Sequence, residues 1–384
     1  MDELTFYVPT RILFGLDVLN RIGRIAAGLG SRAMLVADTL LIDEKVDGTI
    51  HDYLARQGVD LIVFGEVGPG ATSAVVERAI ELSKAGRCDL VIGMGGIRSL
   101  SFAKCVARMS VVDASFDDYF AGPASLEEPI RALPYIEIPT TCRSPFMLTD
   151  ECLIVDARNR RSSIVNVGKR ADCALIDPVL ALTLSEKYTV STLLDTLLSA
   201  IEAYFSRKST FLSDTLSLRA IGTITSMMDD LASHSDDRNL RFRASQAGLL
   251  VAMGLTMTTQ GVGTALAYAS SGKEMVPKSM VAAVMLPYIL ERGMLSQPKK
   301  VDRIGTVLGE EIYGKPLKDF SVQVVDAVRQ RMGLLQTPMR LKDLGVSADN
   351  LVEIASIAHA MPMASFLAEP MDQEAIYGLL REAY

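Results

Sequence analysis

The chain has 384 residues, of which 49% are hydrophobic, so it can bury a substantial core, and its length favours two domains. This composition excludes a disordered or fibrous protein. The formal net charge is −7 and no dense run of Lys or Arg is present, so the electrostatic pattern of a nucleic-acid binder is missing and we expect no nucleic-acid partner.

The N-terminal segment MDELTFYVPTRILFG carries acidic residues and no long apolar stretch, which argues against a secretory signal and predicts a cytoplasmic protein. The most apolar stretch, residues 247–272, is interrupted by threonines, Gln260 and several glycines, so it predicts close-packed core helices and no membrane span. The five cysteines are odd in number and have no CxxC spacing, so we expect reduced, mostly buried thiols.

Short apolar runs alternate with amphipathic helical segments from about residue 33 to residue 140. The predicted strands are residues 33–37, 60–64, 89–93 and 135–139, and the predicted helices are residues 42–58, 72–86 and a segment from about Ser99. This alternation predicts βαβ units, and hence an α/β domain with a doubly wound parallel sheet over residues 1–184. Ligands of such sheets bind beyond the carboxyl ends of the strands, so the turns after residues 93 and 139 are the places to search.

Strand patterns stop after about residue 185, and the rest of the chain predicts an all-α domain over residues 185–384. The predicted helices include residues 192–206, 213–232, 318–332 and 371–384, the last with Asp372 as its N-cap. A Met-rich segment extends to about residue 292, and we expect its methionines to fill the core; they are Met253, Met257, Met275, Met280 and Met285.

A polar stripe runs along the leucine-rich helix predicted over residues 192–206. Asp195, Ser199, Glu202 and Ser206 recur at helical spacing and share one face. The spacing alone favours a face exposed to solvent, because a polar stripe on an amphipathic helix usually faces water. A polar cleft is the alternative.

Five segments in order give the chain a resemblance to the iron-containing (group III) alcohol dehydrogenase family, with its dehydroquinate-synthase-like fold. They are ILFGLDVLNRIG, DLVIGMGG, YIEIPTT, ALIDPVLALTLSEKYTVSTLLDTLLSAIEAYFS and MVAAVMLPYIL. The resemblance implies an N-terminal NAD(P)-binding domain and a helical C-terminal domain that holds one Fe²⁺ or Zn²⁺ by an Asp and three His. The nominal function is NAD(P)-dependent oxidoreduction of a small alcohol or aldehyde.

The metal ligands of the family are largely replaced in this chain. The resemblance places the family Asp on Asp195 and the first His on Ser199. The motif HAMAHxLGG…PHG aligns with TALAYASSG…PKS, so Thr264 and Lys278 stand where the other two imidazoles are expected, and Tyr268 stands at a further His. An Asp with hydroxyls and an ammonium is a poor site for a divalent transition metal, so we expect no metal.

The chain has three histidines in all, His51, His234 and His359, and none falls in these motifs. Lys278 could replace the charge of the ion by pairing with Asp195, while the alternative is a surface lysine after Pro277. A Tyr268–Lys278 proton-donor pair is also conceivable, but ten residues of separation do not indicate contact.

The cofactor loops of the family are also altered. Where the family reads GGGSxxDxxK, this chain reads GGIRSLSFAK; where it reads PTTAGTGSE, this chain reads PTTCRSPFM. The retained residues are Gly95, Gly96, Thr140 and Thr141, and the new ones include Ile97, Arg98, Ser101, Arg143, Pro145 and Phe146. Asp38, after the first predicted strand, could bind adenosine ribose hydroxyls or could simply be a turn residue. NAD(P) is therefore a possible but doubtful cofactor.

Two functions remain open at this point. The first is a metal-free reductase in which Asp195, Tyr268 and Lys278 are the catalytic candidates. The second is a catalytically silent paralogue with a structural or regulatory role, or one that binds a small anion between Arg98 and Arg143. We expect a small-molecule or small-anion ligand in either case, and a homo-oligomer, namely a dimer.

Overall fold

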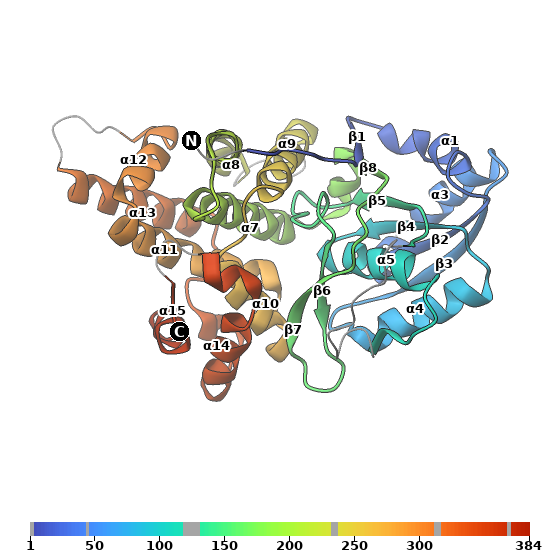
Figure 1. Cartoon of the computed structure of the whole chain (residues 1–384). Helices are drawn as coiled ribbons and strands as arrows, with labels where there is room; N and C mark the ends of the chain where they lie inside the picture. The colour runs from blue at the N-terminus through green and yellow to red at the C-terminus, as the bar shows by residue number, and fades with distance from the viewer. Residues whose placement is uncertain (1–3, 44–45, 118–130, 232–236, 311–315, 367–369) are drawn as a thin grey trace. The chain divides into compact units, whose positions relative to one another are not determined.

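The structure is a computed structural model, and it describes residues 4–43, 46–117, 131–231, 237–310, 316–366 and 370–384. The chain divides into two compact units (Figure 1). One unit spans Tyr7–Ala181, and the other spans Leu182–Tyr384 together with the first residues through Phe6. We predicted the boundary between the two domains after residue 184, and in the structure the first compact unit ends at Ala181.

The first unit contains a six-stranded sheet in which every pairing is parallel. In spatial order its strands are β1 (Arg11–Phe14), β8 (Cys173–Ile176), β5 (Tyr135–Pro139), β4 (Leu90–Gly95), β2 (Arg32–Asp38) and β3 (Asp60–Val67). The strands β4, β5 and β8 are buried along their whole length, in agreement with sequences that are apolar except for Glu137 of β5.

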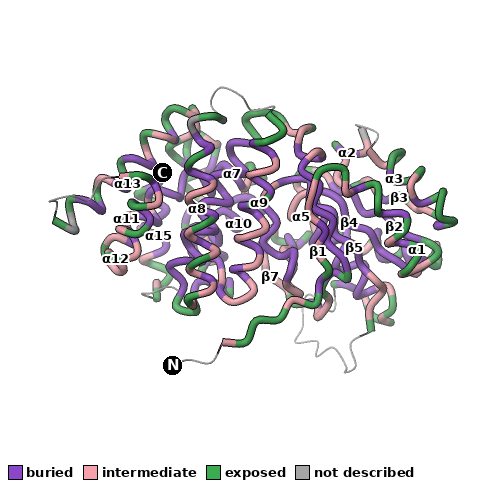
Figure 2. The backbone as a smooth tube through the Cα atoms, turned by 90° about the horizontal axis from the view of Figure 1, so that it is seen from above, coloured by how far each residue is buried: buried purple, intermediate pink, exposed green. Residues whose placement is uncertain are grey.

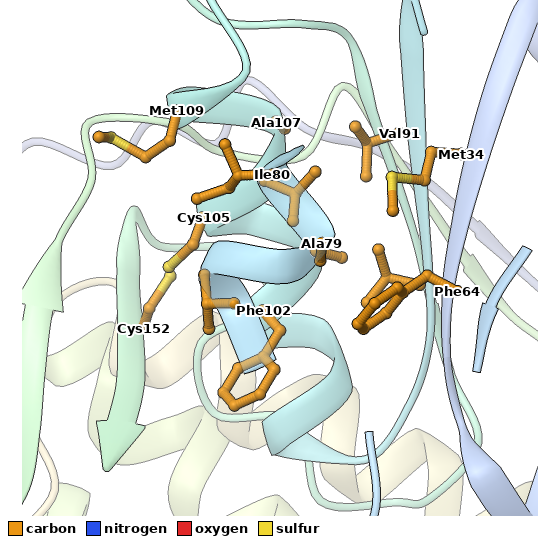
Figure 3. Packing of buried hydrophobic residues seen from close by; sticks show 14 of the residues in the cluster. Met34, Phe64, Ala79, Ile80, Val91, Phe102, Cys105, Ala107, Met109 and Cys152 are labelled. Carbon is orange, nitrogen blue, oxygen red and sulfur yellow. The ribbon is translucent and has the colours of Figure 1, made fainter. Parts of the chain in front are cut away.

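Helices cover both faces of this sheet. They include α1 (Ile22–Ala27), α3 (Val46–Ala55), α4 (Ser73–Ala85) and α5 (Ile97–Met109). Residues Met34 and Val91 point to the core that contains α4 and α5, seen in Figure 3, whereas Leu35 and Ile92 point to a second core that contains α1 and α3. Because successive residues of a strand face opposite ways, each strand feeds both cores. The predicted doubly wound α/β fold is confirmed.

Several elements of this unit differ from the sequence prediction. The strands β1 and β8 were not predicted, nor was the antiparallel hairpin of β6 (Glu151–Val155) and β7 (Ser162–Asn166). The single helix expected over residues 42–58 is two helices, α2 (Thr39–Asp43) and α3, with residues 44–45 outside the described part. All five cysteines are free thiols, and four of them are buried.

The described part of the second unit consists of helices and contains no strand. The longer helices are α7 (Glu186–Phe205), α8 (Phe211–Leu231), α9 (Arg238–Leu255), α10 (Val262–Glu274), α11 (Lys278–Ser296), α12 (Pro298–Val307), α13 (Leu317–Leu334), α14 (Leu351–His359) and α15 (Gln373–Ala383). Asp372 caps α15 as predicted, since its Oδ1 accepts a hydrogen bond of 2.8 Å from the Ala375 N–H.

Helix α7 is the central helix of this unit, and nearly all of its residues from Thr189 onward are buried (Figure 2). Met280 and Met285 fill the core as predicted, but Met275 does not: it is 62% exposed and ends α10 in a left-handed conformation. Among the described residues, no helix is both long enough and apolar enough to cross a membrane.

Candidate functional site

A buried ion pair joins α7 to the first residue of α11. The Asp195 side chain is 1% exposed, and the Lys278 Nζ lies 2.6 Å from its Oδ1 and 2.5 Å from its Oδ2. The predicted pairing of these two residues is therefore confirmed, and the surface-lysine alternative is wrong. The exposed reading of the polar stripe is also wrong, because Ser199, Glu202 and Ser206 are all at most 5% exposed.

The local sequence around Lys278 explains how the lysine reaches this position. Helix α10 ends at Glu274, its C-cap Met275 has a left-handed φ of 59°, and Pro277 is then the N-cap of α11. A proline cannot continue the preceding helix, so the chain turns and starts α11 at Lys278. The next residue, Ser279, hydrogen-bonds Ser191 of α7 at 2.9 Å between the two hydroxyl oxygens. This contact fixes the start of α11 against α7.

The aromatic ring of Tyr268 lies against the Lys278 ammonium group. Its side chain is fully buried, and the Lys278 Nζ lies 4.8 Å from the centroid of its ring. A ring face at this distance attracts a cation. The Tyr268 hydroxyl donates to Gln260 Oε1 at 3.1 Å. The sequence spacing did not indicate that Tyr268 and Lys278 meet. In the structure the lysine ammonium contacts the face of the Tyr268 ring, while the Tyr268 hydroxyl bonds to Gln260.

Glu202 lies about two turns after Asp195 on α7. Its side chain binds the start of α10. Its carboxylate accepts hydrogen bonds from the Gly261 N–H at 2.9 Å and from the Thr264 N–H and hydroxyl at 3.1 and 2.5 Å. Burial raises the pKa of Glu202, and these hydrogen bonds partly oppose that rise. An acid at a helix N-terminus is stabilised by the exposed N–H groups and by the helix dipole. Thr264 stands where the family resemblance places a metal-binding histidine, and here it is hydrogen-bonded to Glu202.

The side chains at this site do not fit a divalent transition metal. Lys278 places a positive charge on both oxygens of Asp195, and the fully buried Ser199 offers a neutral hydroxyl where such an ion prefers imidazole, thiolate or several oxygens. No group of three or more His, Cys, Asp or Glu side chains that could hold an ion occurs in the described part of the chain. His51 and His359 are exposed on α3 and α14, and His234 lies outside the described residues.

A second group of candidate residues lies at the carboxyl edge of the parallel sheet. Gly95 ends β4 with a φ of +139°, and a Cβ there would lie 2.8 Å from the Ser99 Oγ, so glycine is required. Gly96 is the N-cap of α5, and a Cβ there would meet no atom within 4 Å. The Thr140 N–H donates to the Gly95 carbonyl at 3.1 Å. This open helix N-terminus can receive an anion such as a pyrophosphate.

Asp38 and Arg98 lie together at this edge. Asp38 ends β2, and its Oδ1 accepts a hydrogen bond of 3.1 Å from the Leu40 N–H, so it does act as a turn residue. Burial raises the pKa of Asp38, while that hydrogen bond and the charge of Arg98 lower it. Arg98 also donates to the Gly68 carbonyl at 3.3 Å. An acid and an arginine therefore lie at the carboxyl end of the parallel strands, where sheets of this kind bind their ligands.

The loop after β5 is tightly packed. The Arg143 N–H donates to the Thr141 Oγ1 at 3.2 Å, and both residues are less than 10% exposed. The residues Ile97, Pro145 and Phe146 line a void of only about 10 Å³, which is the size of one water molecule. The substitutions in the two loops therefore fill space within this unit.

A buried lysine that was not predicted from the sequence lies beside this loop. Lys104 of α5 is 1% exposed, and its ammonium donates to the carbonyl oxygens of Phe146 at 2.6 Å, Thr149 at 2.8 Å and Glu151 at 3.2 Å. Glu137, in the middle of β5, is also buried, and burial raises its pKa to about 7 against the opposing charge of Lys104. A charged residue inside the apolar run YIEIP was the signal that could have indicated this pair.

Comparison with known proteins identifies relatives along the whole chain. Residues 9–178 match the model described as iron-containing alcohol dehydrogenase, and residues 189–384 match the C-terminal model of the Fe-containing alcohol dehydrogenase family. The 1,3-propanediol dehydrogenase of Klebsiella pneumoniae is 24% identical over 99% of this chain and 98% of its own length.

Solved structures share the fold. The crystal structure of a 1,3-propanediol oxidoreductase has a TM-score of 0.91 and 23% identity, with all of both chains covered. The sulfoacetaldehyde reductase of Bifidobacterium kashiwanohense, solved in complex with NAD⁺, has a TM-score of 0.85 and 19% identity, covering 100% of this chain and 99% of that one.

Proposed function

The chain belongs to the iron-containing alcohol dehydrogenase family, and from this premise we propose that it is a metal-independent, NAD(P)-dependent oxidoreductase of a small aldehyde or alcohol. The observation that carries the proposal is the buried Lys278–Asp195 pair, in which a protein cation contacts the retained carboxylate. An uncharged substitute for the histidines would leave Asp195 as an unpaired buried charge, which is strongly unfavourable.

The residues at the sheet edge fit a dinucleotide in part. Gly96 and the N-terminus of α5 would hold its pyrophosphate, and Asp38 would bind a ribose hydroxyl. When bound, the cofactor exchanges a hydride with the substrate carbon. A structural neighbour of this chain is described as a complex with NAD⁺, which supports the same cofactor class here.

Lys278 is assigned the role of polarising the substrate oxygen. In the reducing direction the carbonyl carbon gains a hydride, the oxygen gains negative charge, and a proton must then reach that oxygen. The ammonium donates an N–H to the oxygen as the charge develops and supplies the proton, which it regains from water. A substrate oxygen competes with Asp195 for the N–H donors, while the Tyr268 ring keeps the cation in place.

The test is activity under metal chelation. We expect NADH- or NADPH-dependent reduction of short aldehydes to persist in excess EDTA, and Lys278→Ala to lower kcat/KM about 10²-fold, as the loss of one oxyanion donor does. The matched control is Lys273→Ala, which removes a lysine of α10 whose partner, Glu353, is 40% exposed. Activity that requires added Fe²⁺ or Zn²⁺, or that survives Lys278→Ala unchanged, would refute the proposal.

The second candidate function, a silent paralogue that binds a small anion, is favoured by one observation. The side chains of Ile97, Pro145 and Phe146 line a void of only about 10 Å³ in the two loops that hold the cofactor in the family. Calorimetry with NADH and NADPH separates the two functions: micromolar binding supports the oxidoreductase. Binding in the millimolar range or weaker, with phosphate or sulfate raising Tm and Arg98→Ala or Arg143→Ala reducing that rise, supports the silent paralogue.

A further inference from the structure

The α/β unit has a large concave surface at a place that the oxidoreductase proposal does not use. This arginine groove has a volume of about 820 Å³ and is lined by residues of β1, α1, α3 and the turns beside them. Its volume lies within the range of pockets that hold small molecules. Four of the residues that line it are exposed arginines: Arg11, Arg21, Arg24 and Arg56.

Several other surface arginines of the same unit are paired with an acid. Arg32, Arg78 and Arg170 each contact a carboxylate within 4.0 Å. Within the described part of the chain, no such ion pair involves any of the four groove arginines. The acid that lines the groove, Asp172, already accepts from the Lys169 ammonium and the Tyr135 N–H, both at 2.7 Å. In a chain of net charge −7, four arginines around one concavity make a local concentration of positive charge.

The groove lies at the opposite edge of the sheet from the glycines of the cofactor loops. Arg11 and Cys173 are the first residues of the parallel strands β1 and β8, and they pair with each other. Gly95, in contrast, is the last residue of β4. Strands that run parallel have all their amino ends at one edge. A ligand in the groove is therefore separate from one at the N-terminus of α5.

One wall of the groove is rigid and carries an aromatic ring. A Cβ at Gly23 would lie 2.0 Å from the Tyr53 carbonyl oxygen, so α1 and α3 pack backbone to backbone there. The half-buried Tyr53 ring lies beneath the Arg56 guanidinium, 5.9 Å from it to the ring centroid. Asn20 and Gln57 add neutral hydrogen-bonding groups to the lining. The wall thus places an aromatic ring and a guanidinium group beside the other arginines.

We propose that the arginine groove binds a multiply phosphorylated small molecule, of the chemical class of a nucleoside triphosphate. Guanidinium groups recognise phosphate oxygens through paired N–H donors, and several of them in one concavity select a ligand with several negative charges. The Tyr53 ring and the Arg56 plane can stack on a nucleobase. This proposal does not rest on the oxidoreductase function, because no residue of the groove belongs to that site.

The experiment is calorimetric titration of the full chain with ATP and with inorganic tripolyphosphate at low ionic strength. We expect both to bind, and ATP to bind more tightly because only ATP carries a base. The groove variant Arg21→Glu/Arg24→Glu should weaken the binding of both at least tenfold. Its control is Arg207→Glu/Lys342→Glu, which makes the same change of net charge at exposed positions of the helical unit and should bind both ligands as the unchanged chain does.

A third variant separates the groove from the cofactor edge. Gly96→Val adds bulk at the N-terminus of α5, where a Cβ meets no atom, and we expect it to leave tripolyphosphate binding unchanged. Loss of binding in Gly96→Val would place the anion at α5 and overturn the proposal. So would absence of tripolyphosphate binding in the unchanged chain, or equal losses in the groove and control variants. Circular dichroism of each variant establishes that it is folded.

Discussion

Replacing Lys278 by methionine tests the ion pair on which the proposed function rests. The change removes the cation and keeps most of the length of the side chain, so Asp195, at 1% exposure, keeps its burial and loses its partner. Two unit charges about 3 Å apart attract by about 5 kcal/mol at an effective dielectric constant of about 20. Breaking a buried pair from one side costs about 3–5 kcal/mol, so we expect Lys278→Met to lower the free energy of unfolding by that amount in urea titrations at pH 7.

Two further variants make this result specific to the pair. The double variant Lys278→Met/Asp195→Leu should recover most of the loss, because replacing both charges by apolar groups removes the unpaired carboxylate. Lys273→Met breaks the pair with Glu353, which is 40% exposed, and should cost less than about 1 kcal/mol. Equal and small losses in Lys278→Met and Lys273→Met would refute the reasoning, as would a double variant less stable than Lys278→Met alone.

Three other predictions concern the pH dependence, the cofactor loop and the metal. Burial raises the pKa of Glu137 from 4.5 to about 7, so the neutral acid stabilises the fold fully below pH 4.5, and about 3 kcal/mol is lost progressively as pH rises from 4.5 through 7; urea titrations at pH 5 and pH 8 should show most of this loss, and Glu137→Gln should abolish it. Gly96→Ala should leave Tm nearly unchanged, whereas Gly95→Ala should lower it because of its positive φ and the contact with Ser99; equal shifts in Tm would contradict the backbone argument. Elemental analysis after incubation with Fe²⁺ or Zn²⁺ should find far less than one equivalent, and a stoichiometric metal bound by Asp195 would show that the ligand argument is wrong.

The fold was largely predictable because long elements carry strong patterns. The four strands read from apolar runs all exist, and so do the helices read from helical spacing in the second unit. The strands β1 and β8 were missed because each has only four residues, too few for a pattern of period two. Met275 was predicted to be in the core but is exposed, because it is the C-cap of a helix. Its left-handed conformation there cannot be predicted from the hydrophobic pattern.

The site was predictable only where the alignment with family segments indicated which distant residues lie together in the fold. The positions of Asp195 and Lys278 are 83 residues apart, and only the family resemblance suggested that they meet. Helical spacing alone gave the wrong environment for Asp195, because a polar stripe has the same period whether it faces water or a buried network. The arginine groove could not be found in the sequence, since its cations come from four separate elements or turns and form no run.

The charge at the proposed site sets its chemistry. A divalent ion beside one carboxylate leaves a net charge of +1, whereas the Lys278 ammonium beside Asp195 leaves a neutral pair. The polarisation of a substrate oxygen should therefore be weaker than a metal would provide, and the ammonium compensates by supplying a proton that a metal does not carry. A neutral pair with a transferable proton suits the reduction of an aldehyde, in which the oxygen ends as a hydroxyl. It suits the reverse reaction less well, because a dication promotes the loss of the hydroxyl proton and an ammonium hydrogen-bonded to a carboxylate does not.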